Sequence, residues 1–492
     1  MINKLIAPLL LWSAIMVCGA CNSHTEPIDR KDRIEHQIDS LVQLYHDYDG
    51  FNGAVLVSHE GEVIYKKGFG MANMELKTPN TTATKFRIAS MTKTFTAVLI
   101  LQLVAEGKLE LHTPISNYLP QFPKEQGMEI TVHHLLTHSS GIPNNYEGNS
   151  MLNRFPDKHR PEGLVHQFWG LPLEFTPGDR FSYSNSGYNV LGYLLEEVSG
   201  MSFEQLLREK ILNPLGMKNT GVERHRPLIN NRAQGYFTSF GTTYNANYID
   251  MSTVYAAGYI YSTVEDLHLW QSALYSEEIV PKQYLELMVE KHIYDSQEGG
   301  FYGYGWEIKH RHLGNSKATV ETVGHGGAID GFCSMLTVIP SSRSSIIFLN
   351  NTRRAYLNTM TTAITGILNQ STYDFPKKPL AKFMANVIKN EGIEAGIEYV
   401  KKHQNNPDFY LDETELIVEG YRLLHDGNAQ HAAQVFELSI DVFPDRDNPY
   451  DSYAGAMMTM GNNEVAIEYY QKSLEINPNN KNAEAMLKRL KN

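Results

Sequence analysis

The chain has 492 residues, of which 42% are hydrophobic and 20% are charged, and its formal net charge is -12. These proportions are typical of a globular protein, and the length favours two or more domains. The excess of acidic residues argues against a nucleic-acid-binding protein, because such proteins need basic groups that neutralise phosphates.

The N-terminal 20 residues have the layout of a secretory signal peptide. Lys4 supplies positive charge, and residues 5–17 form an apolar run that is too short to cross a bilayer comfortably. Two small residues then precede Cys21, an arrangement that resembles a bacterial lipoprotein processing site. We therefore predict a signal peptide over residues 1–20, a lipidated Cys21 and a tether over residues 21–30. A soluble exported protein, cut nearby, is the alternative, and lipidation would place the protein in the periplasm or at the outer membrane.

The three cysteines are too few for a disulfide framework once a signal peptide is removed. Cys18 leaves with the signal, and acylation of Cys21 leaves Cys333 as the remaining free thiol. Because no local signature marks Cys333 as a nucleophile, we interpret it as a small buried filler.

The central region is predicted to run from helix to strands, then through helices back to strands. Apolar positions at helical spacing predict helices, and runs of β-branched and aromatic residues between turns predict strands. In chain order the elements are a helix over 29–48, strands over 51–58 and 62–68, helices over 92–106, 131–138, 188–199 and 202–210, strands over 303–309, 319–323, 332–339 and 345–350, and a helix over 355–368. Strands at both ends with helices between them predict an α+β fold, with one antiparallel sheet and an inserted helical region.

From about residue 376 the chain contains an internal repeat. Gly-Asn, Ala, aromatic and Pro positions recur with an offset of 34 residues, a period that resembles the tetratricopeptide repeat. The matching pairs are Gly427 and Gly461, Asn428 and Asn462, Ala432 and Ala466, Phe436 and Tyr470, and Pro444 and Pro478. Residues 376–492 are thus predicted to form an all-α solenoid of helical hairpins that binds a protein partner or positions substrate. A generic helical bundle is the alternative.

Ser90 and Lys93 open the long apolar helix predicted over 92–106. A spacing of three residues places both side chains on the same face of a helix. A serine hydroxyl is a weak nucleophile that needs a base, and a lysine serves as that base when burial lowers its pKa. A helix cap followed by a solvated lysine would give the same string, SMTK. The following residues are almost wholly apolar, however, and a lysine among them is costly unless it is used or paired.

The string YSN supplies Tyr183 and Asn185. A tyrosine beside a lysine can share its proton and act as a relay. An asparagine can donate to a substrate carbonyl or hold Lys93 in place. Taken alone, the string fits an ordinary surface turn equally well.

The string HGGA begins at His325, directly after a predicted strand. Its two glycines allow the backbone to approach a substrate closely, so we assign Gly326 and Gly327 to substrate binding. A backbone N–H in this string, together with that of Ser90, would form an oxyanion hole. A histidine in a turn near a strand is the plain alternative for His325.

Three histidines, His133, His134 and His138, have two members at a spacing of four and so suggest a metal site. The HExxH arrangement requires a glutamate directly after the first histidine, and Leu135 occupies that place. We therefore predict neither a metal nor another cofactor.

Taken in chain order, the three strings resemble the serine β-lactamase and penicillin-binding-protein superfamily, most closely class C β-lactamases and their esterase and D-peptidase relatives. Four flanking segments agree with the pattern of that family: ITVHHLLTHSSGIP (130–143), PGDRFSYSNSGYNVLGY (177–193), LNPLGMKNT (212–220) and AAGYIYSTVEDLHLW (256–270). The resemblance covers about residues 30–370, so we place this domain at residues 31–370. It implies an antiparallel sheet flanked by helices, with an all-helical lobe in which the histidine segment is structural.

The resemblance also implies a role for each candidate residue. Ser90 would be the acylated nucleophile, and Lys93 would be its base. Tyr183 would activate the deacylating water or relay the proton of the leaving group, and Asn185 would orient Lys93 and the acyl amide. The backbone N–H groups of Ser90 and Ala328 would form the oxyanion hole.

His325 departs from the β-lactamase pattern, which has a lysine at this position. That lysine binds the substrate carboxylate, and a mostly neutral histidine would bind it less well. We therefore expect an exported serine hydrolase that forms an acyl-enzyme with esters or D-amino-acid-type amides. A true β-lactamase is one alternative, and a non-catalytic sensor or scaffold with binding repeats is another.

Overall fold

The computed structural model describes residues 30–144, 160–239, 242–352 and 356–491. The predicted signal peptide, Cys21 and nearly all of the predicted tether lie outside these ranges. Within them, no helix has both the length and the apolar character needed to cross a membrane.

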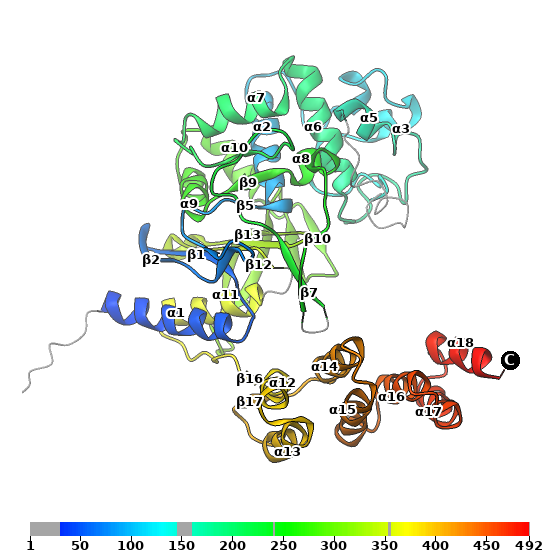
Figure 1. The fold of residues 1–492 in the computed structure, drawn as a ribbon. Helices are drawn as coiled ribbons and strands as arrows, with labels where there is room; N and C mark the ends of the chain where they lie inside the picture. The colour runs from blue at the N-terminus through cyan, green and yellow to red at the C-terminus, as the bar shows by residue number, and fades with distance from the viewer. Residues whose placement is uncertain (1–29, 145–159, 240–241, 353–355, 492) are drawn as a thin grey trace, which may run out of the picture.

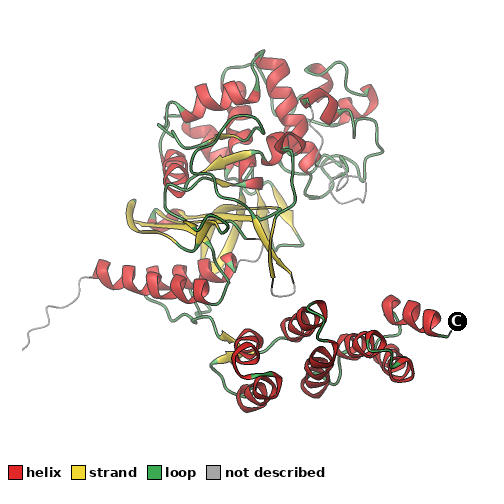
Figure 2. Cartoon of the chain, in the orientation of Figure 1, coloured by secondary structure: helices red, strands yellow, loops and turns green. Residues whose placement is uncertain are grey.

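An eight-stranded antiparallel sheet forms the centre of the molecule (Figures 1 and 2). In spatial order its strands are β10 (Ile293–Asp295), β11 (Gly300–Tyr302), β12 (Glu307–His312), β13 (Thr319–Ile329), β14 (Phe332–Ile339), β15 (Ser344–Asn350), β1 (Gly53–His59) and β2 (Glu62–Gly68). The side chains of β15 are all buried, and those of β1 are buried except at its last residue. Both strands are therefore apolar runs, because helices cover both faces of the sheet.

Two separate hydrophobic cores lie against the two faces of the sheet. One contains α1 (Arg30–Asp47) and α11 (Leu357–Leu368), which lie together below the sheet in Figure 1. The other contains α2 (Thr92–Ala105), α6 (Asn185–Ser199) and α9 (Val264–Ser272). Strand β1 contributes alternate residues to each core, as the two-residue period of a strand requires. The predicted α+β arrangement is confirmed for this sheet domain, residues 30–375.

The single strand predicted over 303–309 is wrong. The chain forms β11 and β12 instead, and residues 303–306 make the turn between them. Gly305 has a φ of +80°, and a Cβ there would lie 2.8 Å from the carbonyl oxygen of Lys93. Glycine is required because the turn adopts a left-handed conformation and presses against α2.

Strand β13 is also longer than the predicted strand over 319–323, since it continues to Ile329. The string HGGA therefore lies within the strand and not after it. Two glycines disfavour a strand by propensity alone, so the pairing with β14 decides the structure here.

The C-terminal helices form a third, separate core. They are α12 (Leu380–Glu391), α13 (Ile393–His403), α14 (Glu413–His425), α15 (Ala429–Val442), α16 (Asp447–Thr459), α17 (Asn463–Ile476) and α18 (Lys481–Leu490). Helices α16 and α17 begin 34 residues after α14 and α15, so the helices follow the period of the sequence. Gly420 lies directly against the Phe436 ring, which lets α14 and α15 pack closely.

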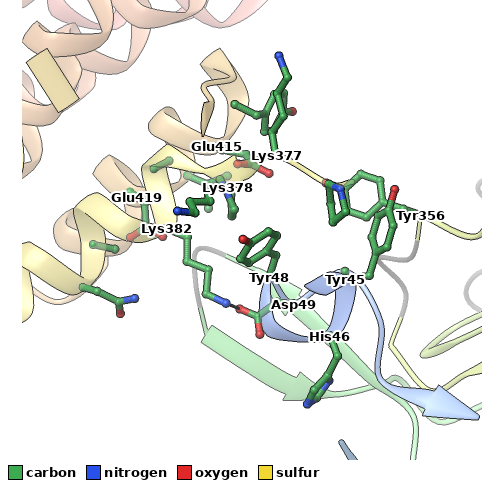
Figure 3. Close-up of a pocket in the computed structure, with 18 of the residues that line it drawn as sticks. Tyr45, His46, Tyr48, Asp49, Tyr356, Lys377, Lys378, Lys382, Glu415 and Glu419 are labelled. Carbon is green, nitrogen blue, oxygen red and sulfur yellow. Dashed lines mark ion pairs between the residues drawn. The ribbon is translucent and has the colours of Figure 1, made fainter. Parts of the chain in front are cut away.

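The sheet domain and the C-terminal helices meet at the end of α1. Lys382 on α12 forms an ion pair with Asp49 at 2.8 Å (Figure 3). The Tyr48 and Phe383 rings lie edge to face. A groove of about 1950 Å³ lies at this junction. Its walls come from the end of α1, the residue before α11, the segment between α11 and α12, and helices α12 and α14. They include Tyr48, Asp49, Tyr356, Lys377, Lys378, Lys382, Glu415 and Glu419.

Four histidines gather in the helical lobe above the sheet. The His133 ring lies 5.1 Å from the ring of His112, 5.9 Å from that of His134 and 5.4 Å from that of His292. Burial lowers the pKa of His133 to about 4 and lowers those of His134 and His292. Within the described residues, no group of three potential ligands is arranged to hold a metal ion.

A chain that ends at residue 375 should fold by itself. The buried residues of the two sheet-domain cores end at Leu368, so the truncation removes none of them. Loss of the exposed Lys382–Asp49 ion pair should cost at most about 1 kcal/mol and lower the melting temperature by less than about 4 °C. Calorimetry checks this, and a broad, non-cooperative transition of the truncated chain would contradict it.

Acidification should destabilise the sheet domain before most carboxylates titrate. The folded-state pKa of His133 is depressed, so the unfolded chain binds more protons between about pH 6.5 and pH 4, and stability falls as pH falls through that window. From pH 7 to pH 5 the loss from His133 alone should be roughly 2 kcal/mol. Urea unfolding at both pH values measures the change, and His133→Gln should reduce it. An equal pH dependence in both proteins would count against this account.

Candidate active site

Ser90 lies where a short strand turns into the central helix. Strand β5 (Phe86–Arg87) leads into the 3₁₀ turn η1 (Ala89–Met91), and α2 follows directly. Ala89 has a φ of +48°, an uncommon value for a residue other than glycine. Such strained backbone often occurs at functional sites. Ser90 is partly exposed at this turn, so a substrate can reach its hydroxyl.

Lys93, one turn along, has 0% exposure. Its Nζ lies 3.1 Å from Ser90 Oγ, 2.8 Å from Asn185 Oδ1 and 2.9 Å from the carbonyl oxygen of Ala257. The two carbonyl-type oxygens can only accept hydrogen bonds, whereas the serine hydroxyl can also donate. A neutral amine that donates its two hydrogens to Asn185 and Ala257 would therefore direct its lone pair at the Ser90 hydroxyl.

Burial lowers the pKa of Lys93 well below its ordinary value of 10.5. None of the three groups that bind Nζ carries a charge, so no ion pair opposes this effect. The Tyr183 and Tyr188 rings lie 4.8 Å and 5.6 Å from Nζ and shield it further from water. The site therefore favours the neutral amine, which is the form that accepts a proton.

Tyr183 and Asn185 flank the start of α6. Ser184 is the N-cap of this helix, and its hydroxyl accepts the N–H of Gly187 at 3.1 Å. Asn185 then directs its amide oxygen at Lys93. Burial raises the pKa of Tyr183, although a hydrogen bond with Ser90 lowers it. Tyr183 is therefore a protonated phenol beside the serine hydroxyl.

The HGGA string forms a free strand edge beside Ser90. Strand β12 pairs with β13 up to Gly324, so the residues that follow pair on the β14 side alone. At Gly327 a Cβ would lie 2.2 Å from the Ile88 carbonyl oxygen and 3.1 Å from the Ser90 nitrogen. Only glycine allows this approach, which brings the Ser90 N–H next to the strand edge. Ala328, the next residue on that edge, is exposed.

His325 is 3% exposed, and protein atoms bind both of its ring nitrogens. Nδ1 lies 2.5 Å from the carbonyl oxygen of Gly326, and Nε2 lies 3.0 Å from the hydroxyl of Tyr302. The carbonyl requires a proton on Nδ1, so a neutral ring accepts the Tyr302 hydroxyl at Nε2. Burial lowers the pKa of His325 to about 4. The ring therefore does not present the free cation that a lysine would offer.

Of the other sequence candidates, His138 lies beside the site, whereas His133, His134 and Cys333 lie away from it. His133 and His134 belong to the four-histidine cluster of the lobe, whereas the His138 ring lies 4.3 Å from the Tyr183 ring. Cys333 packs against the core of α1 and α11, on the opposite face of the sheet from α2.

Three contacts of the site were not predicted from the sequence. The carbonyl of Ala257 lies in a family-like segment, but a backbone oxygen has no sequence signature of its own. Tyr302 lies at the end of β11, just before the wrongly predicted strand. His138 was considered only as a metal ligand, and its contact with Tyr183 follows from a fold that brings distant segments together.

Comparisons with known proteins identify the family of the sheet domain. The family described as Beta-lactamase matches residues 38–367. Penicillin-binding protein 4* of Bacillus subtilis (strain 168) is 30% identical over 72% of this chain and 80% of its own length.

Two solved structures extend the likeness. The penicillin-binding protein from Bacillus halodurans is 28% identical, with a TM-score of 0.57, over 66% of this chain and 98% of that one. The D-amino acid amidase from Ochrobactrum anthropi SV3 is 25% identical, with a TM-score of 0.58, over 69% of this chain and 98% of that one. With these matches over most of the sheet domain, the chain belongs to the β-lactamase and penicillin-binding-protein superfamily of serine hydrolases.

Proposed function

We propose that the protein hydrolyses esters or D-amino-acid-type amides through an acyl-enzyme on Ser90. The observation that carries this proposal is the set of contacts around Lys93, a buried amine whose two carbonyl acceptors leave its lone pair for the Ser90 hydroxyl. A desolvated lysine paired in this way is a general base. The relative named a D-amino acid amidase supports the amide class.

Acylation follows from the positions of the groups. Ser90 Oγ attacks the substrate carbonyl carbon while its proton moves to Lys93 Nζ. The oxygen of the tetrahedral intermediate takes hydrogen bonds from the N–H groups of Ser90 and Ala328. The leaving amine or alkoxide departs with a proton from the protonated Tyr183, and the proton that Lys93 took from Ser90 then restores the phenol. Water then attacks the acyl carbon while its proton passes to the neutral Lys93. The acyl C–Oγ bond breaks, the carboxylic acid leaves, and Ser90 Oγ regains that proton from Lys93 Nζ.

A neutral His325 argues against efficient penicillin hydrolysis. Recognition of a substrate carboxylate at this position requires a cation, and the His325 ring is neutral, with its nitrogens engaged by Gly326 and Tyr302. Amides and esters without a carboxylate at this position need no such cation. The β-lactamase activity is therefore the second candidate, and hydrolysis of nitrocefin measures it against the Ser90→Ala variant.

The ends of the chain have proposed roles of their own. Export and lipidation at Cys21 rest on the signal-like sequence, and a Cys21→Ala variant that still incorporates palmitate would overturn the lipidation.

The 34-residue spacing of α14–α17 supports the assignment of the C-terminal helices to the tetratricopeptide class. A protein partner for them is a proposal that the groove at the domain junction favours.

Replacing the nucleophile should abolish covalent chemistry. Ser90→Ala should lose labelling by a fluorophosphonate probe and turnover of a p-nitrophenyl ester and of D-alanine amide. Intact-mass spectrometry detects the adduct, and a Ser58→Ala variant on β1 should label like the unmodified chain. Equal labelling of Ser90→Ala and the unmodified chain would refute the assignment.

Removing the base should slow acylation while the fold survives. Lys93→Met retains the length of the side chain without the amine, and acylation should fall by about 10²- to 10⁴-fold. Lys93→Arg should be equally slow, because a guanidinium remains protonated and cannot accept a proton. Stopped-flow labelling measures the rates, and thermal unfolding verifies the fold. Retained activity in Lys93→Arg would show that Lys93 acts by charge alone.

The pH profile should follow the two shifted groups. Because burial lowers the pKa of Lys93 well below its ordinary value, the neutral base forms at a lower pH than in an ordinary lysine, so kcat/KM should rise and level off well below about pH 10. The raised pKa of Tyr183 keeps the phenol protonated, so no decline should occur below about pH 10. Steady-state rates with an ester substrate test this. A plateau that begins only above about pH 10 would show an ordinary lysine.

A further inference from the structure

His138 is a buried histidine that the mechanism above does not use. It follows α4 (Val132–Leu136), is 1% exposed and has a φ of +58°. Its Nδ1 accepts the backbone N–H of Ser184 at 3.0 Å, and its carbonyl oxygen accepts the N–H of Ser182 at 2.9 Å. His138 therefore binds the backbone on both sides of Tyr183, at Ser182 and at Ser184.

The His138 ring also supports the aromatic side chains of the site. Its centroid lies 4.3 Å from that of Tyr183, with an angle of 34° between the planes. The centroids of the Tyr188 and Tyr302 rings each lie 4.8 Å away. These two tyrosines contact Lys93 and His325 respectively, so the His138 ring lies at the back of the candidate site.

The second ring nitrogen, Nε2, argues against a role for His138 that is limited to filling space in the core. Since Nδ1 accepts a hydrogen bond, the proton of the neutral ring is on Nε2, and this buried atom has no hydrogen-bond partner among the residues that the structure describes. Phenylalanine would fill the same space without burying an unpaired donor. The benefit that offsets this cost is the bond to Ser184, which phenylalanine cannot make.

We propose that His138 is a positioning residue for catalysis, which fixes the Ser184 peptide and thereby aims Tyr183 and Asn185 at Ser90 and Lys93. Ser184 is the N-cap of α6, so its backbone sets where the helix begins and where the Asn185 amide points. A small displacement of catalytic groups lowers a rate much more than it lowers stability. The proposal rests on the proposed function, because it requires that Ser90 and Lys93 react.

Three variants at position 138 distinguish the contribution of the aromatic ring from that of the Nδ1 hydrogen-bond acceptor. His138→Phe retains the ring and loses the acceptor, His138→Asn retains an acceptor oxygen and tolerates the positive φ, and His138→Ala loses both. We expect kcat of an ester substrate to fall about 10- to 100-fold in His138→Phe, with KM changed less than about twofold. His138→Asn should recover part of that loss, and the acidic limb of the pH profile should shift in His138→Phe.

His134→Phe is the matched control. His134 lies on α4, the short helix that precedes His138, and its Nδ1 likewise accepts a backbone N–H, that of Thr131 at 3.2 Å. It belongs to the lobe cluster, so its loss should lower the melting temperature but leave kcat and the pH profile unchanged.

The outcomes are distinguishable. Absence of Ser90-dependent turnover in the unmodified chain would overturn the proposed function. Turnover in His138→Phe equal to that of the unmodified chain, or an unshifted pH profile, would overturn the positioning role alone. If the variants do not fold, ¹⁵N-histidine NMR of the unmodified chain decides, because the proposal requires an unprotonated Nδ1 on His138. A signal from protonated Nδ1 would refute it.

Discussion

The burial of the Lys93 amine is the constraint on which the rest of the site depends. A charged ammonium in this position would lack an opposing charge, since its partners are the Ser90 hydroxyl, the Asn185 amide and the Ala257 carbonyl. The fold therefore makes the neutral form the favoured one and supplies two acceptors for its hydrogens. Helix α2 must be covered on nearly all sides to exclude water, which explains its almost uninterrupted apolar sequence.

Glycines allow the segments around α2 to pack closely against one another and against the helix. Gly305 lets the turn after β11 press against the backbone at Lys93, and Gly327 lets β13 approach Ile88 and Ser90. Gly192 on α6 lies against Ala256, whose neighbour Ala257 binds Lys93. A Cβ at any of these three positions would come within 3.0 Å of another atom. Distant segments thus pack closely around Ser90 and Lys93 because each has a glycine at its point of contact.

The site and the junction groove lie on opposite sides of the sheet. Lys93 belongs to the helix on one face, whereas α1 and α11 cover the other face, and the C-terminal helices join at the end of α1 (Figure 1). The two domains have separate cores, and few direct contacts hold them together. The sheet therefore separates the groove from the nucleophile.

The sequence alone predicts the pairing of Ser90 with Lys93, the order of the main strands and helices apart from β11 and β12, and the period of the C-terminal helices. These features are local or periodic, so neighbouring residues encode them. That β13 runs through the glycines of HGGA depends on tertiary contacts, because pairing with β14 overrides weak propensity. The tertiary structure also decided that His325 is buried against Tyr302 and that His138 belongs behind Tyr183 and not to a metal cluster. Such contacts join residues far apart in the chain, and their chemistry depends on burial, which no short string of residues specifies.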